Sequence, residues 1–149
     1  MADTREVLLS RLVTVCGAVE GVNAAGRNVL DVANLVRPAV IVQDGIEELR
    51  DSPPGARYTE LGRMELTPDV TVIVRGGNGV DGGGLLSLYR KRVLAAVLGD
   101  AELIAATGRN GGIRYGGCLA APPDPEGREY RLDLTLVFTY VFKLDDLAV

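Results

Sequence analysis

The sequence contains no histidine and no tryptophan in 149 residues. Histidine is the usual general base near neutral pH and the commonest metal ligand in proteins. Its absence excludes Ser-His-Asp and Cys-His catalysis and any zinc site that needs an imidazole. The only two cysteines, Cys16 and Cys118, are too few for an all-cysteine zinc site within one chain. The composition therefore predicts a protein that is not an enzyme and that holds no metal or cofactor.

Membrane-spanning and secretion patterns are also lacking. No apolar run reaches the roughly 18 residues that a transmembrane helix needs. The N-terminus begins Met1-Ala2-Asp3-Thr4-Arg5-Glu6 and has no basic region followed by an apolar stretch, so it does not resemble a signal peptide. Reduced thiols in a cytosolic protein are the expectation for both cysteines. The net charge of −4 argues against binding nucleic acid through the average field of the chain.

Hydrophobic residues make up 47% of the chain and charged residues 24%, which is typical of one globular domain over residues 1–149. Apolar residues recur at helical spacing in two segments, residues 4–19 and 85–98. The two stripes consist of Leu8, Leu12, Val15 and Val19, and of Leu86, Tyr89, Val93 and Val97. Asp3 or Thr4 can cap the first helix, and Asp100 can cap a further short helix over residues 101–107.

Strands are expected over residues 38–45, 64–75, 113–121 and 128–143, where β-branched or alternating residues lie between turn signals. Residues 21–28 and 122–127 are expected to be turns, and residues 29–36 fit either a helical turn or an irregular edge segment. The sequence thus predicts an α+β fold in α-β-β-α-β-β order, with two helices packed on one face of a four-stranded, mostly antiparallel sheet. The last strand is unusually long, which fits either oligomerisation through that strand or a twisted long hairpin.

Residues 44–63 are expected to form a long polar loop. Its acids are Asp44, Glu47, Glu48 and Asp51, and its arginines are Arg50, Arg57 and Arg63. Clustered carboxylates suit a divalent ion or acid–base chemistry, but the calcium-loop pattern is absent. A mixed-charge loop that is solvated, or that orders against a partner, is the favoured interpretation.

Two further motifs suggest ligands only weakly. Residues 76–84 are rich in glycine, but Leu85 stands where a phosphate loop requires lysine, and Asp81 would repel a phosphate. A flexible connector between strand and helix is therefore expected. Arg90, Lys91 and Arg92 cover about 200° of a helix, so they do not form one patch for nucleic acid. A solvated face or a subunit contact is expected for these three residues.

Several segments together resemble the tail terminator (tail completion) proteins of long-tailed bacteriophages and the related small neck subunits. These segments are the helix beginning at Arg5-Glu6-Val7-Leu8, the strand at residues 38–45 with the acidic loop after it, the strand Val70-Thr71-Val72-Ile73-Val74 before a helix, and the alternating strand at residues 130–140. The likeness is one of layout over most of the chain, since no diagnostic motif is present.

The resemblance implies a structural virion protein of the tail or neck, assembled in the host cytoplasm. It implies a homo-oligomeric ring, typically a hexamer, that caps the tail tube and meets the head connector or neck proteins, with DNA passing through its lumen without sequence-specific binding. The family's loops would place subunit or tube contacts at Asp44, Glu47, Glu48, Arg50, Arg57, Tyr58, Arg63, Asn78 and Asp81. The alternatives are another neck or head-tail joining subunit of the same fold, and a small ligand-binding or enzymatic α+β domain.

Overall fold

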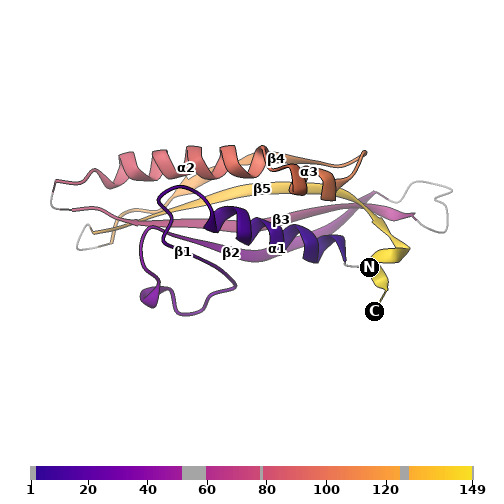
Figure 1. The fold of residues 1–149 in the computed structure, drawn as a ribbon, viewed down its shortest axis with the longest axis horizontal. Helices are drawn as coiled ribbons and strands as arrows, with labels where there is room; N and C mark the ends of the chain where they lie inside the picture. The colour runs from indigo at the N-terminus through magenta and orange to yellow at the C-terminus, as the bar shows by residue number, and fades with distance from the viewer. Residues whose placement is uncertain (1–2, 52–59, 78, 125–127, 149) are drawn as a thin grey trace.

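The computed structural model describes residues 3–51, 60–77, 79–124 and 128–148 of the chain. Within these residues, three α-helices lie against a five-stranded sheet whose strand order is β1-β2-β3-β5-β4. The helices are α1 (Thr4–Gly17), α2 (Gly82–Leu98) and α3 (Ala101–Thr107), and the strands are β1 (Ala24–Arg27), β2 (Ala39–Asp51), β3 (Glu60–Arg75), β4 (Gly112–Ala120) and β5 (Glu129–Lys143). Two 3₁₀ turns, η1 (Val32–Asn34) and η2 (Leu144–Leu147), complete these elements. Figure 1 shows an elongated molecule in which the long strands follow the longest axis.

The hydrophobic core lies between one face of the sheet and the three helices. Alternate residues of β3 and β5 are buried in it, for example Val70 and Val72 opposite Leu134 and Leu132. Both stripes expected from helical spacing are buried there, which confirms them: Leu8, Leu12, Val15 and Val19 on and just after α1, and Leu86, Tyr89, Val93 and Val97 on α2. No helix in the described part of the chain is long and apolar enough to cross a membrane.

The predicted four-stranded sheet is wrong, because residues 24–27 form a fifth strand inside a segment expected to be a turn. β1 pairs in parallel with β2, from Ala24 opposite Ala39 to Arg27 opposite Val42, so the sheet is mixed. The segment Ala-Ala-Gly-Arg has little intrinsic strand preference. It becomes a strand because the edge of β2 offers hydrogen bonds and because its small residues allow close packing against α1. A Cβ added at Gly17 of α1 would lie only 3.3 Å from the Cβ of Ala25.

The predicted layer of two helices is also wrong, because α3 joins it. The short helix over residues 101–107 is confirmed, and the Asp100 carboxylate accepts a hydrogen bond from the Leu103 amide at 2.9 Å. Leu103 is fully buried in the common core. The helix lies beside α1. Arg11 of α1 donates two hydrogen bonds, of 2.7 and 3.0 Å, to the carboxylate of Asp100 at the start of α3. The seven-residue helix α3 therefore packs in the same layer as α1 and α2.

The predicted loop at residues 44–63 is wrong over most of its length. β2 continues to Asp51 and β3 begins at Glu60, while residues 52–59 lie outside the described part of the chain. Asp44-Gly45 is a β-bulge rather than a turn, because the register shifts between Gln43 and Ile46. Gly45 has φ 69°, and a Cβ there would overlap the carbonyl oxygen of Thr67. The bulge therefore redirects the strand without ending it.

The glycine-rich connector expected at residues 76–84 is shorter than predicted. β3 ends at Arg75 and α2 already begins at Gly82, so that the last three glycines form its first turn. Gly82 packs directly on Tyr130, and a Cβ at this position would overlap the tyrosine ring. The glycine therefore allows the N-terminal end of α2 to lie close to β5.

The connection between β1 and β2 lies close to residues on the face of the sheet that the helices leave open. A Cβ at Gly26 would overlap the side chain of Val29, and Gly26 projects to that face because its neighbours Ala25 and Arg27 project towards α1. Ile41 and Ile73 are buried on the open face although they do not belong to the helical core. We infer that residues 28–38, with the helical turn η1 among them, cover this end of the face.

Candidate functional site

The rest of the open face is a polar surface that extends along β2, β3, β5 and β4. Strand alternation places Asp69 and Thr71 of β3, and Asp133 and Thr135 of β5, on the face opposite the buried Val70 and Leu134. Helices therefore cover the sheet on one side only over this region. An open sheet face of this extent is available for a partner.

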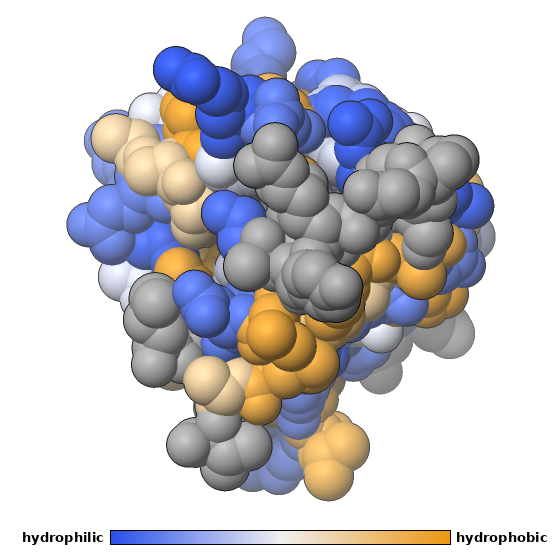
Figure 2. All heavy atoms as spheres, turned by 90° about the vertical axis from the view of Figure 1, so that its right-hand side faces the viewer, coloured by the Kyte–Doolittle hydropathy of each residue, from blue (hydrophilic) through white to orange (hydrophobic). Residues whose placement is uncertain are grey.

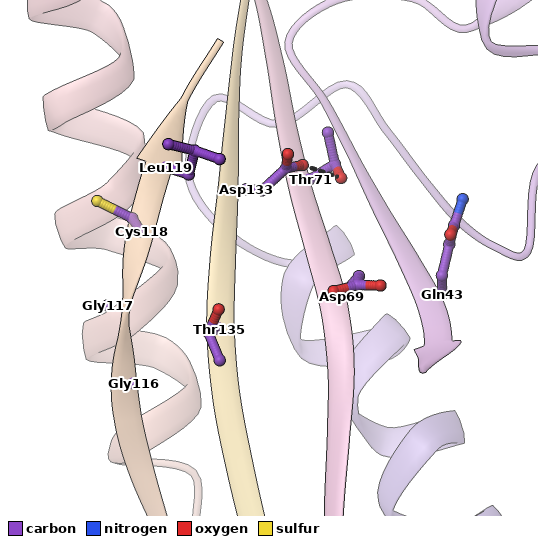
Figure 3. A pocket seen from close by; sticks show the side chains of 9 residues that line it. All are labelled: Gln43, Asp69, Thr71, Gly116, Gly117, Cys118, Leu119, Asp133 and Thr135. Atoms are coloured by element: carbon purple, nitrogen blue, oxygen red, sulfur yellow. Dashed lines mark hydrogen bonds between the residues drawn. The ribbon is translucent and has the colours of Figure 1, made fainter. Parts of the chain in front are cut away.

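A shallow hollow of about 580 Å³ lies on this face, and Figure 3 shows its lining residues. Gly116 and Gly117 form a bulge in β4, where the register shifts between Tyr115 and Gly117. Because neither glycine carries a side chain, the surface is lowered beside β5. Thr71 donates a hydrogen bond of 2.7 Å to the Asp133 carboxylate. Asp69 is exposed on β3 and also lines the hollow, on the side away from β4.

The lining of the hollow is mainly polar. It presents two exposed carboxylates and two threonine hydroxyls, with Leu119 at its rim 71% exposed. Within the described residues, no three His, Cys, Asp or Glu side chains are grouped closely enough to hold a metal ion. The surface can accept hydrogen bonds from cationic or hydroxyl-bearing groups of a partner.

A second charged group lies further along the same face, and it includes two of the residues expected at subunit or tube contacts. Arg50 pairs with Glu48 at 2.9 Å and with Glu65 at 3.3 Å, and Arg114 reaches Glu65 at 3.5 Å. The Arg50 side chain is 55% exposed. Exposed pairs of this kind contribute little to stability. Their charges therefore remain available to a partner.

Asp44, one of the residues expected at a contact, takes part in an ion-pair network that links α1 to the sheet. Arg27 donates to Asp44 at 2.7 Å and to Glu6 of α1 at 2.7 Å, and Arg5 reaches Asp44 at 3.3 Å. The hydrogen bonds from Arg27 lower the pKa of Asp44 and of Glu6 below their ordinary values. The network is a structural one between helix and strand.

The remaining predicted contact residues are dispersed over the molecule. Glu47 faces the helical side, where the buried Tyr140 hydroxyl donates to its carboxylate; burial first, and then this hydrogen bond, raise the pKa of Tyr140 above its ordinary value. Arg63 is exposed on β3, and Asp81 occupies the N-cap position of α2 without a capping hydrogen bond from its side chain. Arg57, Tyr58 and Asn78 lie outside the described residues. The structure therefore does not gather the predicted set into one site.

Sequence reasoning missed the hollow and the partners of Asp44. Asp133 stands in the alternating pattern of the last strand, but nothing in the sequence indicates that Asp69 lies on the adjacent strand of the same face. Two adjacent glycines within a strand, such as Gly116 and Gly117, often indicate a β-bulge, so the bulge in β4 could have been predicted. Arg27 lies in a segment that was expected to be a turn, so its pairing with Glu6 and Asp44 depends on the unpredicted β1.

Comparisons with known proteins leave the family undetermined. No protein-family model matches the sequence, and no curated protein matches it. Among solved structures, the chain is similar to the type 4 fimbrial biogenesis protein PilO from Pseudomonas aeruginosa, with a TM-score of 0.29 and 9% identity over 67% of this chain. The match spans 57% of the PilO chain. A likeness at this level supports no statement about function.

Proposed function

We propose that this chain is a structural subunit that assembles into a ring at the head-proximal end of a phage tail tube, ends tube growth and joins the tail to the head. The observation that carries the proposal is the one-sided sheet. Three helices cover one face, while most of the other face carries polar and mixed-charge residues suited to wet protein contacts.

The sheet edges support self-assembly. In the described part of the chain, β4 pairs with β5 on one side alone, and β2 beyond Val42 pairs with β3 alone. Exposed edges of this length present unpaired amides and carbonyls, and they invite pairing with another chain. Because the two edges differ, contact between copies through them is head-to-tail, and such contacts close into rings when the rotation allows.

The resemblance in element order to tail terminators is the reason for proposing a tail-tube ring as the assembly. The mixed sheet is compatible with a subunit that contacts its partners through strand edges and an open face. Light scattering and native mass spectrometry of the purified chain should give a closed oligomer. Negative-stain images of the chain mixed with its cognate tail-tube protein should show rings at one tube end and tubes that no longer lengthen.

The outcome separates the proposal from its alternatives. A chain that stays monomeric at high concentration and leaves tube growth unchanged contradicts it. A ring that binds the head connector but not the tube indicates another neck or head-tail joining subunit of the same fold.

A further inference from the structure

A groove of about 590 Å³ lies at the end of the molecule remote from the two termini. It lies where the segment before β2 meets the junction of β3 and α2. Its walls include the apolar Leu35, Val36 and Leu85, together with Arg37 and Arg75. Val36 is 64% exposed. The groove thus combines an apolar lining with positive charge.

The two arginines of the groove differ in their surroundings. The Arg37 side chain is only 7% exposed, pairs with Glu129 at 3.0 Å and donates to the Leu35 carbonyl at 2.5 Å. Its Nε is buried and has no hydrogen-bond partner in the described part of the chain. Arg75 is exposed, and its side chain makes no ion pair or hydrogen bond with any described residue. The groove therefore holds positive charge that the chain itself leaves uncompensated, which favours an acidic occupant.

The opposite end of the molecule presents a segment of matching chemistry. η2 is fixed by Asp146, whose carboxylate accepts from the Thr4 amide at 2.9 Å and from the Lys143 amide at 2.9 Å. Leu144 and Leu147 are 51% and 55% exposed, and residues three apart lie on one side of a 3₁₀ turn. Figure 2 shows apolar surface exposed at this end.

Asp145 stands between these two leucines. It is exposed, and its carboxylate has no partner among the described residues. The turn therefore presents two apolar side chains and one free negative charge on a rigidly anchored backbone. Figure 1 shows this turn, in yellow beside the C-terminus, towards the end of the long axis opposite the connection between β3 and α2.

We propose that η2 of one copy docks into the groove of a second copy, with Leu144 and Leu147 on its apolar walls and Asp145 against Arg75. This contact rests on the proposed ring, for which it supplies one interface. Because groove and turn are different surfaces at opposite ends, the contact is heterologous and can be repeated from copy to copy until a ring closes. Complementary charge fixes its direction and register.

Charge reversal tests the pair without disturbing the core. Arg75→Glu and Asp145→Arg each replace an attraction by a repulsion, so each variant alone should self-associate about tenfold more weakly than the wild type. The double variant carries the reversed pair and should regain the wild-type oligomer. A mixture of the two single variants should also regain association, with the two chains alternating, since the turn of each variant carries the charge opposite to that of the other variant's groove. Matched melting temperatures confirm that the variants are folded, and Lys91→Glu on α2 serves as the charge control.

A peptide of residues 143–148 tests the groove independently of the ring. Labelled peptide should bind the Asp145→Arg chain, whose groove is intact, about tenfold more tightly than it binds the Arg75→Glu chain. Such binding by a monomeric wild-type chain supports the contact and contradicts the ring. Absence of peptide binding, together with no association between the Arg75→Glu and Asp145→Arg chains, overturns the contact.

The remaining outcomes separate this contact from the proposed function. A wild-type ring that persists unchanged in both single variants overturns the contact and leaves the ring standing. If Arg75→Glu forms normal rings that no longer cap tubes, the groove takes a segment of the tube protein, and a second copy is not its occupant.

Discussion

At the scale of single residues, Gly82 shows how one missing Cβ positions a helix. We expect Gly82→Ala to lower the free energy of unfolding by about 1–3 kcal/mol, because the new methyl group overlaps the Tyr130 ring. Gly83→Ala is the matched control, since its Cβ would meet only Asp81 Oδ1 at 3.5 Å. That variant should be neutral or slightly stabilising. Urea denaturation of both variants measures the difference, and equal stabilities would contradict the packing argument.

The two cysteines differ in burial and therefore in reactivity. Burial raises the pKa of the Cys16 thiol to about 12, whereas Cys118 is exposed on β4. Because the thiolate is the reactive form, a thiol reagent at pH 8 should label Cys118 rapidly and Cys16 only after unfolding. Mass spectrometry of native and denatured samples reads the labelled position. Rapid labelling of Cys16 in the native chain would contradict the burial of α1.

At the scale of elements, the Arg27 network determines how α1 meets the sheet. Arg27→Met should lower the free energy of unfolding at pH 7 by about 1–3 kcal/mol, because it leaves the partly buried Asp44 without its main partner. Arg50→Met is the control, since its pairs are more exposed and should contribute less than about 1 kcal/mol. Chemical denaturation of both variants gives the comparison, and an equal loss in the two would contradict the assignment.

The same network predicts how stability depends on pH. The pKa of Asp44 in the folded chain lies below its ordinary value of 3.8, so the unfolded chain binds the proton more tightly. This contribution to stability is therefore complete above pH about 4 and is lost as the pH falls through the lower, folded value. Melting temperatures measured from pH 7 to pH 2 should fall below about pH 4, less steeply in Arg27→Met. A wild-type melting temperature that rises on acidification would contradict the sign.

At the scale of the whole molecule, the sheet is protected unevenly. The central strands β3 and β5 are paired on both sides, whereas β4 and the distal part of β2 have one partner in the described residues. In the free chain, amides of β3 and β5 should exchange most slowly, and the outer amides of β4 should exchange fast. On assembly, the edge amides should become protected if copies meet through them. Hydrogen exchange at low and high protein concentration tests this, and unchanged edge exchange would place the contacts elsewhere.

The sequence by itself determined the local elements and the face that each one buries. The stripes of α1 and α2, the cap of α3 and the alternation of β5 depend on periodicity and on short-range hydrogen bonds, which are readable within about ten residues. Tertiary structure decided the rest. β1 exists because β2 offers an edge, Asp44-Gly45 is a bulge because Thr67 and Pro68 lie opposite, and the hollow and the groove combine residues far apart in the chain. These features depend on strand order and on contacts between distant segments, which local patterns do not encode.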